Sequence, residues 1–475
     1  MINTVLILPI VFCIIILLIK NRTINNVLIT LYSIFHGALS LLYITNPEII
    51  VNNKYFELSA SNYIFYAILS IVFMAVAFYN NAYSKNMNFS DIKMSRYSAM
   101  ILIFVLSMSG SILANGIGLA WIFIEATTLA SAYLIYFNKT KHSIEAAWKY
   151  VFICSIGIAL AFVGIILLTI ATGNMPSLHY TDLISNAKNF DKFWLNTSFV
   201  FILFGIGTKM GLAPVHFWLP DAHSESPSPV SALLSATLLN CAFLFVLNVY
   251  KIIVAAGDTY FANVMMFVMG FLSLFVTSVF LYHTSNYKRM LAYSSIENMG
   301  ILIIATSLGG IAYYAAILHL IGHSLIKASF FLTSGNILEL FESKRIKSIK
   351  ALNEVDKKTA WLWIASFLGI CAFPPSLLFI SEFLIVKEFL IQKHYILCIL
   401  FLFFLTIILF GMGKVIFNMV YGEKNEEKSS SALDNKSKVT TFMYIPQFIM
   451  LLCIFCLGIY MPKIIDDIIR NTIIF

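Results

Sequence analysis

The stretch LFGIGTKMGLAPVHFWLPDAHSESPSPVS, residues 203–231, decides the fold that this sequence predicts. Its first half is an apolar run that carries a single lysine, Lys209, and reaches Pro214 five residues later. Because proline lacks a backbone donor and clashes with the preceding turn, we expect the helix to break there. In lipid, a broken helix is tolerated only where protein or a water-filled cavity satisfies the freed backbone groups. A broken helix beside a buried lysine is typical of proteins that move ions.

Composition places the whole chain in a membrane. Of its 475 residues, 60% are hydrophobic and 11% are charged, and the mean hydropathy is +0.87. A soluble chain would carry about twice that share of charge. The first residues lack a basic leader and a small-residue cleavage site, so we interpret them as a retained helix. Cysteines are scattered through apolar runs, and the CxxC of Cys453 and Cys456 favours packing residues over a metal or redox centre.

Apolar runs of about 20 residues are long enough to cross a bilayer. About fourteen such runs predict an all-α polytopic membrane protein. The tenth is short, and the twelfth is interrupted by Pro374 and Pro375. The approximate ranges are 4–20, 27–45, 62–83, 97–114, 117–137, 146–171, 194–213, 229–250, 262–283, 296–309, 312–338, 360–391, 395–421 and 441–461.

Lysine and arginine concentrate in alternate loops, which predicts the orientation of the chain. The richer loops are expected to face the cytoplasm, so both termini are predicted outside. This topology accounts for the formal net charge of +8 without a nucleic-acid partner. The richer loops hold Lys20, Arg22, Lys85, Lys93, Arg96, Lys139, Lys141, Lys288, Arg289, Lys344, Arg345, Lys347, Lys350, Lys357, Lys358, Lys424, Lys428, Lys436 and Lys438.

The two proline breaks suggest an internal repeat. Each break falls in a block of five predicted spans, and an odd number of spans makes the second block start from the opposite membrane side. A polar, Ser-rich linker at residues 422–440 is expected to be disordered. The predicted division is an N-terminal three-helix segment at 1–96, inverted repeats at 97–250 and 251–421, and the linker with a last helix at 422–475.

Charged residues inside the spans are functional candidates, because each costs about 2.5–3.5 kcal/mol to place at mid-membrane. Glu125, in GLAWIFIEATTLASAYLIY, is either a neutral carboxyl held by a hydroxyl or the titrating partner of Lys209. At about 4 Å and an effective dielectric of about 20, such a pair gains about 4 kcal/mol. Desolvation opposes this gain, so moving the carboxylate would switch Lys209 between holding and releasing a proton. Lys149, in EAAWKYVF, points toward the same pair or snorkels to the interface.

A second cluster lies in AAILHLIGHSLIKASFFLTSGN, residues 315–336. His319, His323 and Lys327 are spaced by four, so they share one face of a helix. Histidine titrates near neutral pH and is a natural proton relay. Zinc binding competes with this interpretation because His-x3-His is a ligand spacing, although no third ligand is close in sequence. Purely structural histidines are a further alternative.

Carboxylates and histidines near the breaks complete the candidate set. Glu382 follows the second break, and we predict that it exchanges protons with the outside as the counterpart of Lys209. Glu297, in AYSSIENMG, is predicted to start the tenth span, either as a cap or as a site of proton uptake from the inner side. His216 and His223 are predicted on an inner-side loop after the first break, where an aqueous funnel is expected. No nucleotide loop or nucleophile–base motif is present, so we predict no catalytic residue.

Three stretches resemble a known family: KMGLAPVHFWLPDAHSESPSPVSALLS, YKRMLAYSSIENMGI and LHLIGHSLIKASFFLTSGNI. They resemble the antiporter-like proton-pumping subunits of respiratory complex I, Mrp-type cation/proton antiporters and membrane-bound nickel–iron hydrogenases. The resemblance covers roughly residues 97–420 and implies fourteen helices with two inverted five-helix repeats. It also implies a buried pair at Glu125 and Lys209. His319, His323 and Lys327, in the eleventh predicted span, match the family's central proton connection, and Glu382 matches its terminal residue.

One position departs from the family pattern. Many members carry a lysine where this chain has Asn240, and asparagine cannot titrate. A proton path through that position would need water or Lys327 instead. The combination of Asn240 with the stretches SSIEN and EAAWKYVFICSIGIAL most resembles the hydrogenase-type branch of the family. This branch is the F component of hydrogenase-4 and formate-hydrogenlyase-like complexes.

The resemblance implies a proton-translocating subunit of a complex I-related oxidoreductase in the inner (plasma) membrane. Its expected partners are other membrane subunits, surrounding lipid and a peripheral redox arm, and that arm rather than this chain is expected to hold the redox cofactors. No metal and no nucleic acid are expected on the chain. One alternative is a cation/proton antiporter subunit without a redox partner, with sodium as the second ion. Another is a structural membrane anchor whose channel is degenerate.

Overall fold

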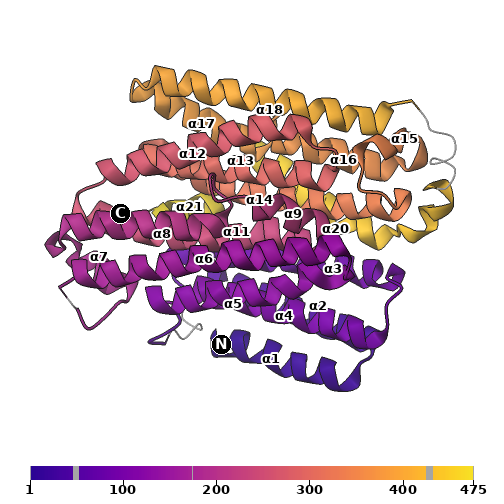
Figure 1. Ribbon diagram of the computed structural model, residues 1–475, viewed down its shortest axis with the longest axis horizontal. Coiled ribbons are helices and arrows are strands. Elements are labelled where there is room, and N and C mark those ends of the chain that lie inside the picture. The colour runs from indigo at the N-terminus through magenta and orange to yellow at the C-terminus, as the bar shows by residue number, and fades with distance from the viewer. Residues whose placement is uncertain (1, 46–52, 174, 424–431, 474–475) are drawn as a thin grey trace.

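The computed structural model describes residues 2–45, 53–173, 175–423 and 432–473, which form helices joined by short turns (Figure 1). Within these ranges, 13 helices are long and apolar enough to cross a membrane. Two shorter helices, one on each side of Pro374 and Pro375, occupy the predicted twelfth span. The prediction of an all-α polytopic membrane protein with about fourteen spans is therefore confirmed.

The helices follow one another as a series of antiparallel rods (Figure 1). The first part of the chain forms α1 (Ile2–Ile19), α2 (Arg22–Thr45), α3 (Ala60–Asn86), α4 (Asp91–Leu113), α5 (Ile117–Ile135), α6 (Lys141–Ala171), α7 (Tyr180–Asn186), α8 (Lys192–Met210), α9 (Trp218–Glu225), α10 (Ser228–Leu233) and α11 (Leu239–Ala256). The second part forms α12 (Tyr260–Phe280), α13 (Tyr287–Leu308), α14 (Gly310–Phe341), α15 (Leu352–Val355), α16 (Lys357–Ile370), α17 (Leu377–Ile391), α18 (Tyr395–Tyr421), α20 (Thr441–Ile459) and α21 (Lys463–Ile473).

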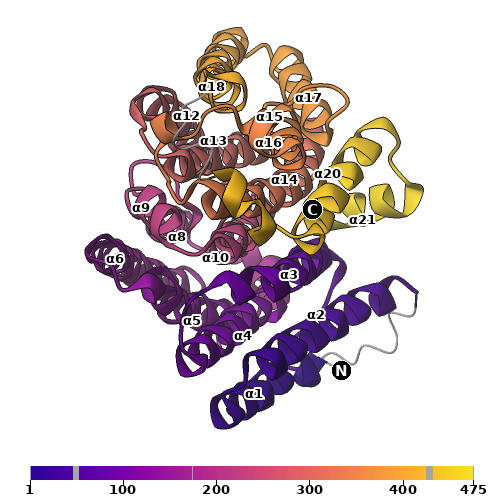
Figure 2. The ribbon, with the colours of Figure 1, turned by 90° about the vertical axis from the view of Figure 1, so that its right-hand side faces the viewer.

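The central helices of the bundle are α10, α11 and α14. Viewed end on, α3 to α6 lie on one side and α12, α13 and α16 to α18 on the other, with α10 and α14 between them (Figure 2). α14 packs against α3, α10, α13, α16, α17 and α20, and its most apolar stretch is wholly buried in protein. Polar side chains on α14 therefore face other helices rather than lipid. The division of the chain into two inverted repeats stays a prediction.

The tenth span begins earlier than the sequence predicts. The predicted start at residue 296 is wrong, because α13 begins at Tyr287. Asn286 caps this helix, and its side chain accepts hydrogen bonds from the backbone N–H groups of Lys288 (2.9 Å) and Arg289 (3.4 Å). The first turns of α13 are polar, so hydropathy does not predict them as part of a membrane span. Packing against α9 and α12 nevertheless buries most of their side chains. Glu297 consequently lies within α13 and not at its start.

Both chain ends lie at the same end of the bundle. Near the start of α3, the side chain of Asn53 donates to Asn3 (2.9 Å), and the Thr472 hydroxyl donates to the carbonyl oxygen of Ala60 (3.3 Å). In α21, hydrogen bonds from Arg470 and Tyr314 hold the pKa of Asp466 below its ordinary value. The opposite end, which holds Arg22, Lys85, Lys344 and Lys438, is called the basic end below. Which end faces the cytoplasm stays a prediction.

The predicted disordered linker, 422–440, lies partly outside the described residues, which omit 424–431. The described remainder includes a short 3-10 helix, Asn435–Lys438, so the prediction of disorder does not hold there. Lys438 forms an ion pair with Glu342 at the end of α14 (2.8 Å). This contact lowers the pKa of the Glu342 carboxyl below its ordinary value and anchors the C-terminal segment to the central helix.

Candidate functional site

The first helix break positions Lys209 in the last turn of α8. The helix ends where Gly211 adopts a φ of +76°, and Pro214 prevents its continuation. The indole N–H of Trp218, at the start of α9, donates to the carbonyl oxygen of Thr208 (2.7 Å). Protein thus satisfies part of the backbone that the break exposes, as a break within lipid requires.

The Lys209 side chain is wholly buried and held by hydroxyl groups. Its ammonium group donates to the Tyr150 hydroxyl (2.6 Å) and lies 3.5 Å from the Thr127 hydroxyl. The same ammonium lies 4.7 Å from the centre of the Tyr150 ring. The Tyr150 hydroxyl is also 2.6 Å from the Ser131 hydroxyl. Lys209 therefore ends in a chain of groups that can accept and donate protons.

Glu125 joins this cluster from α5 without touching Lys209. Its carboxylate accepts hydrogen bonds from the hydroxyls of Thr128 (3.1 Å) and Ser155 (3.5 Å). No carboxylate of a described residue lies within the 4.0 Å ion-pair distance of Lys209. The structure brings Glu125 and Lys209 into one polar cluster, but it does not form the direct ion pair that we expected. The hydroxyl partners of Glu125 agree with the alternative of a carboxyl held by hydroxyls.

Tyr150 is the residue of this site that sequence analysis missed. A tyrosine in an apolar span is ordinary, and only its place beside Lys149 in EAAWKYVF gave a signal. In the structure its ring packs against Trp218, with 4.8 Å between the ring centres. This contact fixes the hydroxyl between Lys209 and Ser131.

We expect the Tyr150→Phe variant to slow proton translocation roughly tenfold, since the Lys209 ammonium loses its shortest hydrogen bond. A hydrogen bond to a charged group contributes about 1.5–3 kcal/mol. Fluorescence quenching of a pH-sensitive dye in inverted vesicles measures the rate. Tyr66→Phe is the matched control, because Tyr66 is buried and its hydroxyl has no hydrogen-bond partner among the described residues. Equal rates in the two variants would contradict a role for Tyr150.

Lys149 lies at the surface, which is the second of the two positions that we considered for it. Its ammonium pairs with Glu145 one turn away (2.6 Å) and with Asp221 of α9 (3.2 Å), and its side chain is 43% exposed. Asp221 also contacts Arg289 of α13. Lys149 therefore links α6 and α9 at the surface and does not join the cluster of Glu125 and Lys209.

The candidate residues of α14 lie in the middle of the bundle, and their spacing of four residues sets them on one face of the helix. His319, His323 and Lys327 are all fully buried. The His319 ring nitrogens lie 3.0 Å from the Ser381 hydroxyl of α17 and 3.0 Å from the Asn298 side-chain oxygen of α13. Neither ring nitrogen of His323 has a hydrogen-bond partner in the described chain.

Lys327 lies two turns from His319 on the same helix. Its ammonium donates to the backbone carbonyl of Leu291 in α13 (2.7 Å). For the zinc alternative, no group of three or more potential metal ligands gathers among the residues that the structure describes. The contacts of His319 with hydroxyl and amide groups suit either a proton relay or a structural histidine.

Asn240 lies between the two clusters, immediately after a π-helical turn at Leu234–Leu238. Its side-chain amide donates to the Ser324 hydroxyl of α14 (2.7 Å) and to the Ala236 carbonyl (2.8 Å). Its side-chain oxygen is buried and has no partner within the described ranges. Asn240 therefore connects α11 to the histidine-bearing helix by hydrogen bonding rather than by a charge.

The second break places two carboxylates beside one cavity. Residues 371–376 separate α16 from α17, and Glu382 lies in the second turn of α17. Glu382 and Glu297 line a cavity of about 340 Å³ together with Cys371, while Phe383 at its rim is 59% exposed. Glu297 thus lines the same cavity as Glu382, the predicted terminal residue of the proton path. This position differs from the start of a helix, where we predicted either a cap or a site of proton uptake from the inner side.

The segment after the first break is a helix, so the predicted inner-side loop is wrong. His223 lies in α9 and is fully buried, with its ring stacked on Phe331 at 4.7 Å, and His216 is 3% exposed. Pro220 and Asp221 occur in the first turn of α9, where a proline is tolerated because its missing N–H would have no partner. Neither histidine therefore lines an open funnel.

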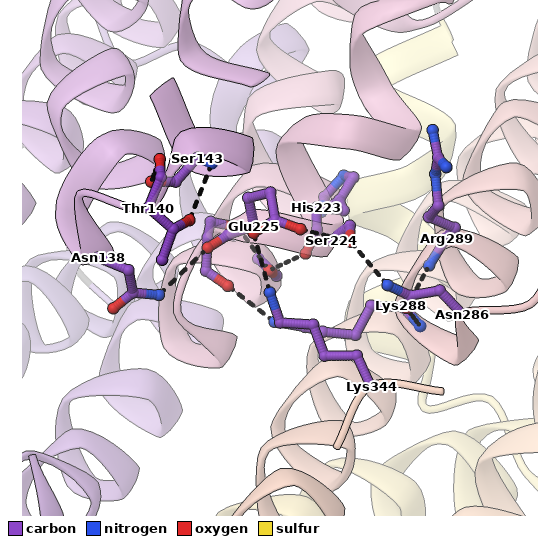
Figure 3. A network of polar contacts seen from close by, with 12 residues as sticks. Asn138, Thr140, Ser143, His223, Ser224, Glu225, Asn286, Lys288, Arg289 and Lys344 are labelled. Atoms are coloured by element: carbon purple, nitrogen blue, oxygen red, sulfur yellow. Dashed lines mark hydrogen bonds and ion pairs between the residues drawn. The ribbon is translucent and has the colours of Figure 1, made fainter. Parts of the chain in front are cut away.

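Beyond His223, a polar network holds the end of α9 (Figure 3). The Ser224 hydroxyl accepts from Asn286 (2.7 Å), and Glu225 forms an ion pair with Lys344 (3.1 Å). The buried Lys288 ammonium donates to the carbonyl oxygen of Ser226 (2.8 Å). These contacts join the first helix break to α13 and to the segment after α14.

Comparison with known proteins shows that the chain is similar to membrane subunits of oxidoreductases and antiporters. Residues 114–409 match the family described as NADH:quinone oxidoreductase/Mrp antiporter, transmembrane. The chain is 31% identical over 458 residues to a hydrogenase-4 component F homolog of Methylacidiphilum infernorum, and the match covers 94% of this chain and 93% of that protein.

Two solved structures share the fold. A chain of the membrane-bound sulfane sulfur reductase, an archaeal respiratory membrane complex, aligns with a TM-score of 0.87 and 19% identity, covering 99% of this chain and 96% of that chain. A chain of the Mrp complex from a Dietzia species aligns with a TM-score of 0.83 and 15% identity, with the same coverage. At these identities the likeness is one of fold alone.

Proposed function

The chain belongs to the NADH:quinone oxidoreductase/Mrp antiporter transmembrane family, and from that membership we propose that it translocates protons. It is an antiporter-like membrane subunit of the complex I-related, hydrogenase-4 type, and the resemblance noted in the sequence is confirmed. One observation carries the proposal of proton transfer. Lys209 and Lys327 are wholly buried inside membrane spans, and neither forms an ion pair with a described residue.

Buried lysines of this kind are costly, which supports a functional role. A lysine at the centre of a span costs about 2.5–3.5 kcal/mol, and such residues usually mark ion or proton pathways. Hydroxyls and carbonyls hold both ammonium groups by hydrogen bonds alone. Either lysine can therefore lose its proton without leaving a carboxylate unpaired.

We place the proton path along the centre of the bundle. Glu125 and Lys209 form its first station, where movement of the carboxylate toward or away from the lysine changes the affinity of Lys209 for a proton. Lys327 and His319 form the central station, and Glu382 is the terminal residue that exchanges with the outside. The separation of Glu125 from Lys209 in the structure supports one of the two states that such a switch requires.

Between the stations, water is the expected carrier. The ring nitrogens of His323 and the side-chain oxygen of Asn240 are buried and have no partner among the described residues. Buried polar groups without a protein partner are normally satisfied by ordered water. Asn240 cannot titrate, so protons pass this point along water that it and Ser324 orient.

The remaining assignments follow from family membership and the loop charges. We propose that the chain lies in the plasma membrane with both termini outside, beside other membrane subunits and a peripheral redox arm. Redox cofactors belong to that arm. Glu297 shares the cavity of Glu382, so we assign it to the terminal station.

We expect the His323→Ala variant to lose part of its proton translocation, about threefold to tenfold. The variant removes one relay imidazole, while His319 and Lys327 remain in place, and a positioned proton-transfer group contributes up to about 10²–10⁴-fold where it is essential. Proton uptake into inverted vesicles gives the rate. His283→Ala is the control, since His283 lies exposed after α12. Full activity in His323→Ala would remove this histidine from the path.

The driving force separates the proposed function from its competitor. The family description and the shared fold of the Mrp complex both favour a cation/proton antiporter subunit as the second candidate. Inverted vesicles containing the whole complex should acidify when its redox substrates are added in sodium-free buffer. Acidification changes driven only by a sodium gradient would favour the antiporter. Vesicles that respond to neither would favour the structural anchor.

A further inference from the structure

Two hollows lie along α3, and neither contains a residue of the proton path. The first has a volume of about 380 Å³ and lies at the basic end of the bundle, between α2 and α3. Its polar lining includes Arg22, Asn26, Thr30, Asn81 and Lys85. It therefore combines two cations with amide and hydroxyl groups on the flank of the membrane domain.

The second hollow is apolar and lies between α3 and α20. It has a volume of about 280 Å³, and its lining includes Ile71, Ala75, Phe78, Phe442 and Ile449. Phe78 is 42% exposed and Ile449 is 52% exposed, so this hollow opens to the outer surface of the spanning helices. An apolar ligand would reach it from the bilayer.

One face of α3 joins the two hollows. Ile71, Ala75, Phe78, Asn81 and Lys85 follow one another at intervals of three or four residues, so they line one side of the helix. At about 1.5 Å per residue, Ile71 lies about 15 Å deeper than Asn81. That depth is about half of the ~30 Å hydrocarbon core, the thickness of one lipid leaflet. The face thus changes from polar to apolar over the length of one acyl chain.

The positive charges of Arg22 and Lys85, in the first hollow, can attract an anion. The Lys85 side chain is exposed and forms no ion pair with any residue that the structure describes. The Arg22 guanidinium donates to the carbonyl oxygens of Ser84 (3.2 Å) and Phe89 (2.7 Å), which fixes its position without neutralising it. Among the described residues, its ion-pair partner is Asp91 at 3.7 Å, whose side chain is 61% exposed. The hollow therefore retains a net positive charge.

We propose that the two hollows and the face of α3 between them form one groove, which binds one anionic phospholipid. The phosphate lies between Arg22 and Lys85, and an acyl chain lies along α3 over Phe78 and Ile71. Basic pockets between membrane helices are suited to anionic head groups because the charge meets the phosphate at the interface. A helix of a partner subunit would cover the apolar hollow but would leave Lys85 without an anion and Arg22 with Asp91 alone. The groove is separate from Lys209 and the α14 residues, so the proposal does not rest on proton transfer.

Retention of lipid by the purified complex tests the proposal. The complex is reconstituted in nanodiscs of phosphatidylcholine and phosphatidylglycerol in equal amounts and then released into detergent, and native mass spectrometry counts the bound lipids. We expect retained phosphatidylglycerol, weakened roughly fivefold by Lys85→Gln, because a basic side chain near the membrane surface contributes about that factor to binding of anionic lipid. Lys141→Gln is the matched control, since Lys141 is an exposed lysine elsewhere on the domain.

A second variant tests the acyl-chain half of the groove. Ala75→Trp fills the apolar hollow and should displace phosphatidylglycerol, whereas Val268→Trp, at a lipid-facing position of α12 that is 56% exposed, should not. Equal retention in Lys85→Gln and Lys141→Gln would overturn the proposal. So would equal retention of phosphatidylcholine. Binding of inorganic phosphate alone, unaffected by Ala75→Trp, would identify a free-anion site and would also overturn it.

Discussion

Replacing Lys209 with alanine is expected to reduce proton translocation to the background of vesicles that lack the complex. Lys209 is the titratable group at the first helix break, and its ammonium is held by the Tyr150 and Thr127 hydroxyls. Alanine leaves no group at this position that can hold a proton. Proton transfer from the first station to the central one therefore loses its donor, and dye quenching driven by the redox substrate should disappear.

Assembly of the Lys209→Ala complex should be preserved. Removing one partner of a buried ion pair is strongly destabilising, but Lys209 has no carboxylate in ion-pair contact within the described chain. The variant instead removes a buried charge that is costly to desolvate. Lys192→Ala is the matched control, because Lys192 is exposed at the start of the same helix. A correctly assembled Lys209→Ala complex that pumps at the normal rate would eliminate the proposed switch.

The Glu125→Gln variant is expected to give a loss nearly as large. Glutamine has the shape of glutamate and can still accept the hydrogen bond from Thr128, but it carries no charge. At an effective dielectric of about 20, a unit charge at about 4–8 Å acts on a second charge with about 2–4 kcal/mol. Without that change in energy, movement of the side chain cannot alter the protonation of Lys209. Redox-driven acidification of inverted vesicles measures the loss.

Two further variants separate charge from packing at Glu125. Glu125→Asp keeps the charge and should restore part of the activity, whereas Glu57→Gln removes a carboxylate near the start of α3 and should have no effect. If Glu125→Gln pumped normally, the carboxyl would be a neutral, structural group held by Thr128 and Ser155. That result would leave the interpretation of Lys327 and His319 untouched, because their contacts do not involve α5.

Boundaries were predictable where hydropathy and helix chemistry agree. Pro214 and the Pro374–Pro375 pair marked both breaks, because a proline inside a helix leaves a carbonyl without a partner wherever it occurs. The start of α13 was missed because its polar first turns are buried by protein rather than exposed to water. For the same reason, the segment of His223 was taken for a loop although it forms α9.

The partners of the charged residues were much harder to predict. Lys209 contacts Tyr150, which is 59 residues away in the chain, and Lys149 contacts Asp221, which is 72 residues away. The sequence identified Lys209 and Lys149 as candidates but not their partners. Helices such as α14 are buried on every side, so hydropathy leaves their rotation about the helix axis undetermined, and that rotation decides which side chains meet.

The amino-acid sequence by itself determined that the chain crosses the membrane about fourteen times, where two spans break and that Glu125, Lys209 and Lys327 lie inside spans. The sequence could do so because each span in lipid must complete its backbone hydrogen bonds within itself, and this requirement depends on local sequence. Only the tertiary structure decided that Glu125 and Lys209 bind hydroxyl groups rather than each other, that Glu297 joins Glu382, and that two hollows lie along α3. These features depend on how helices distant in sequence pack and rotate against one another, which no local property of the chain specifies.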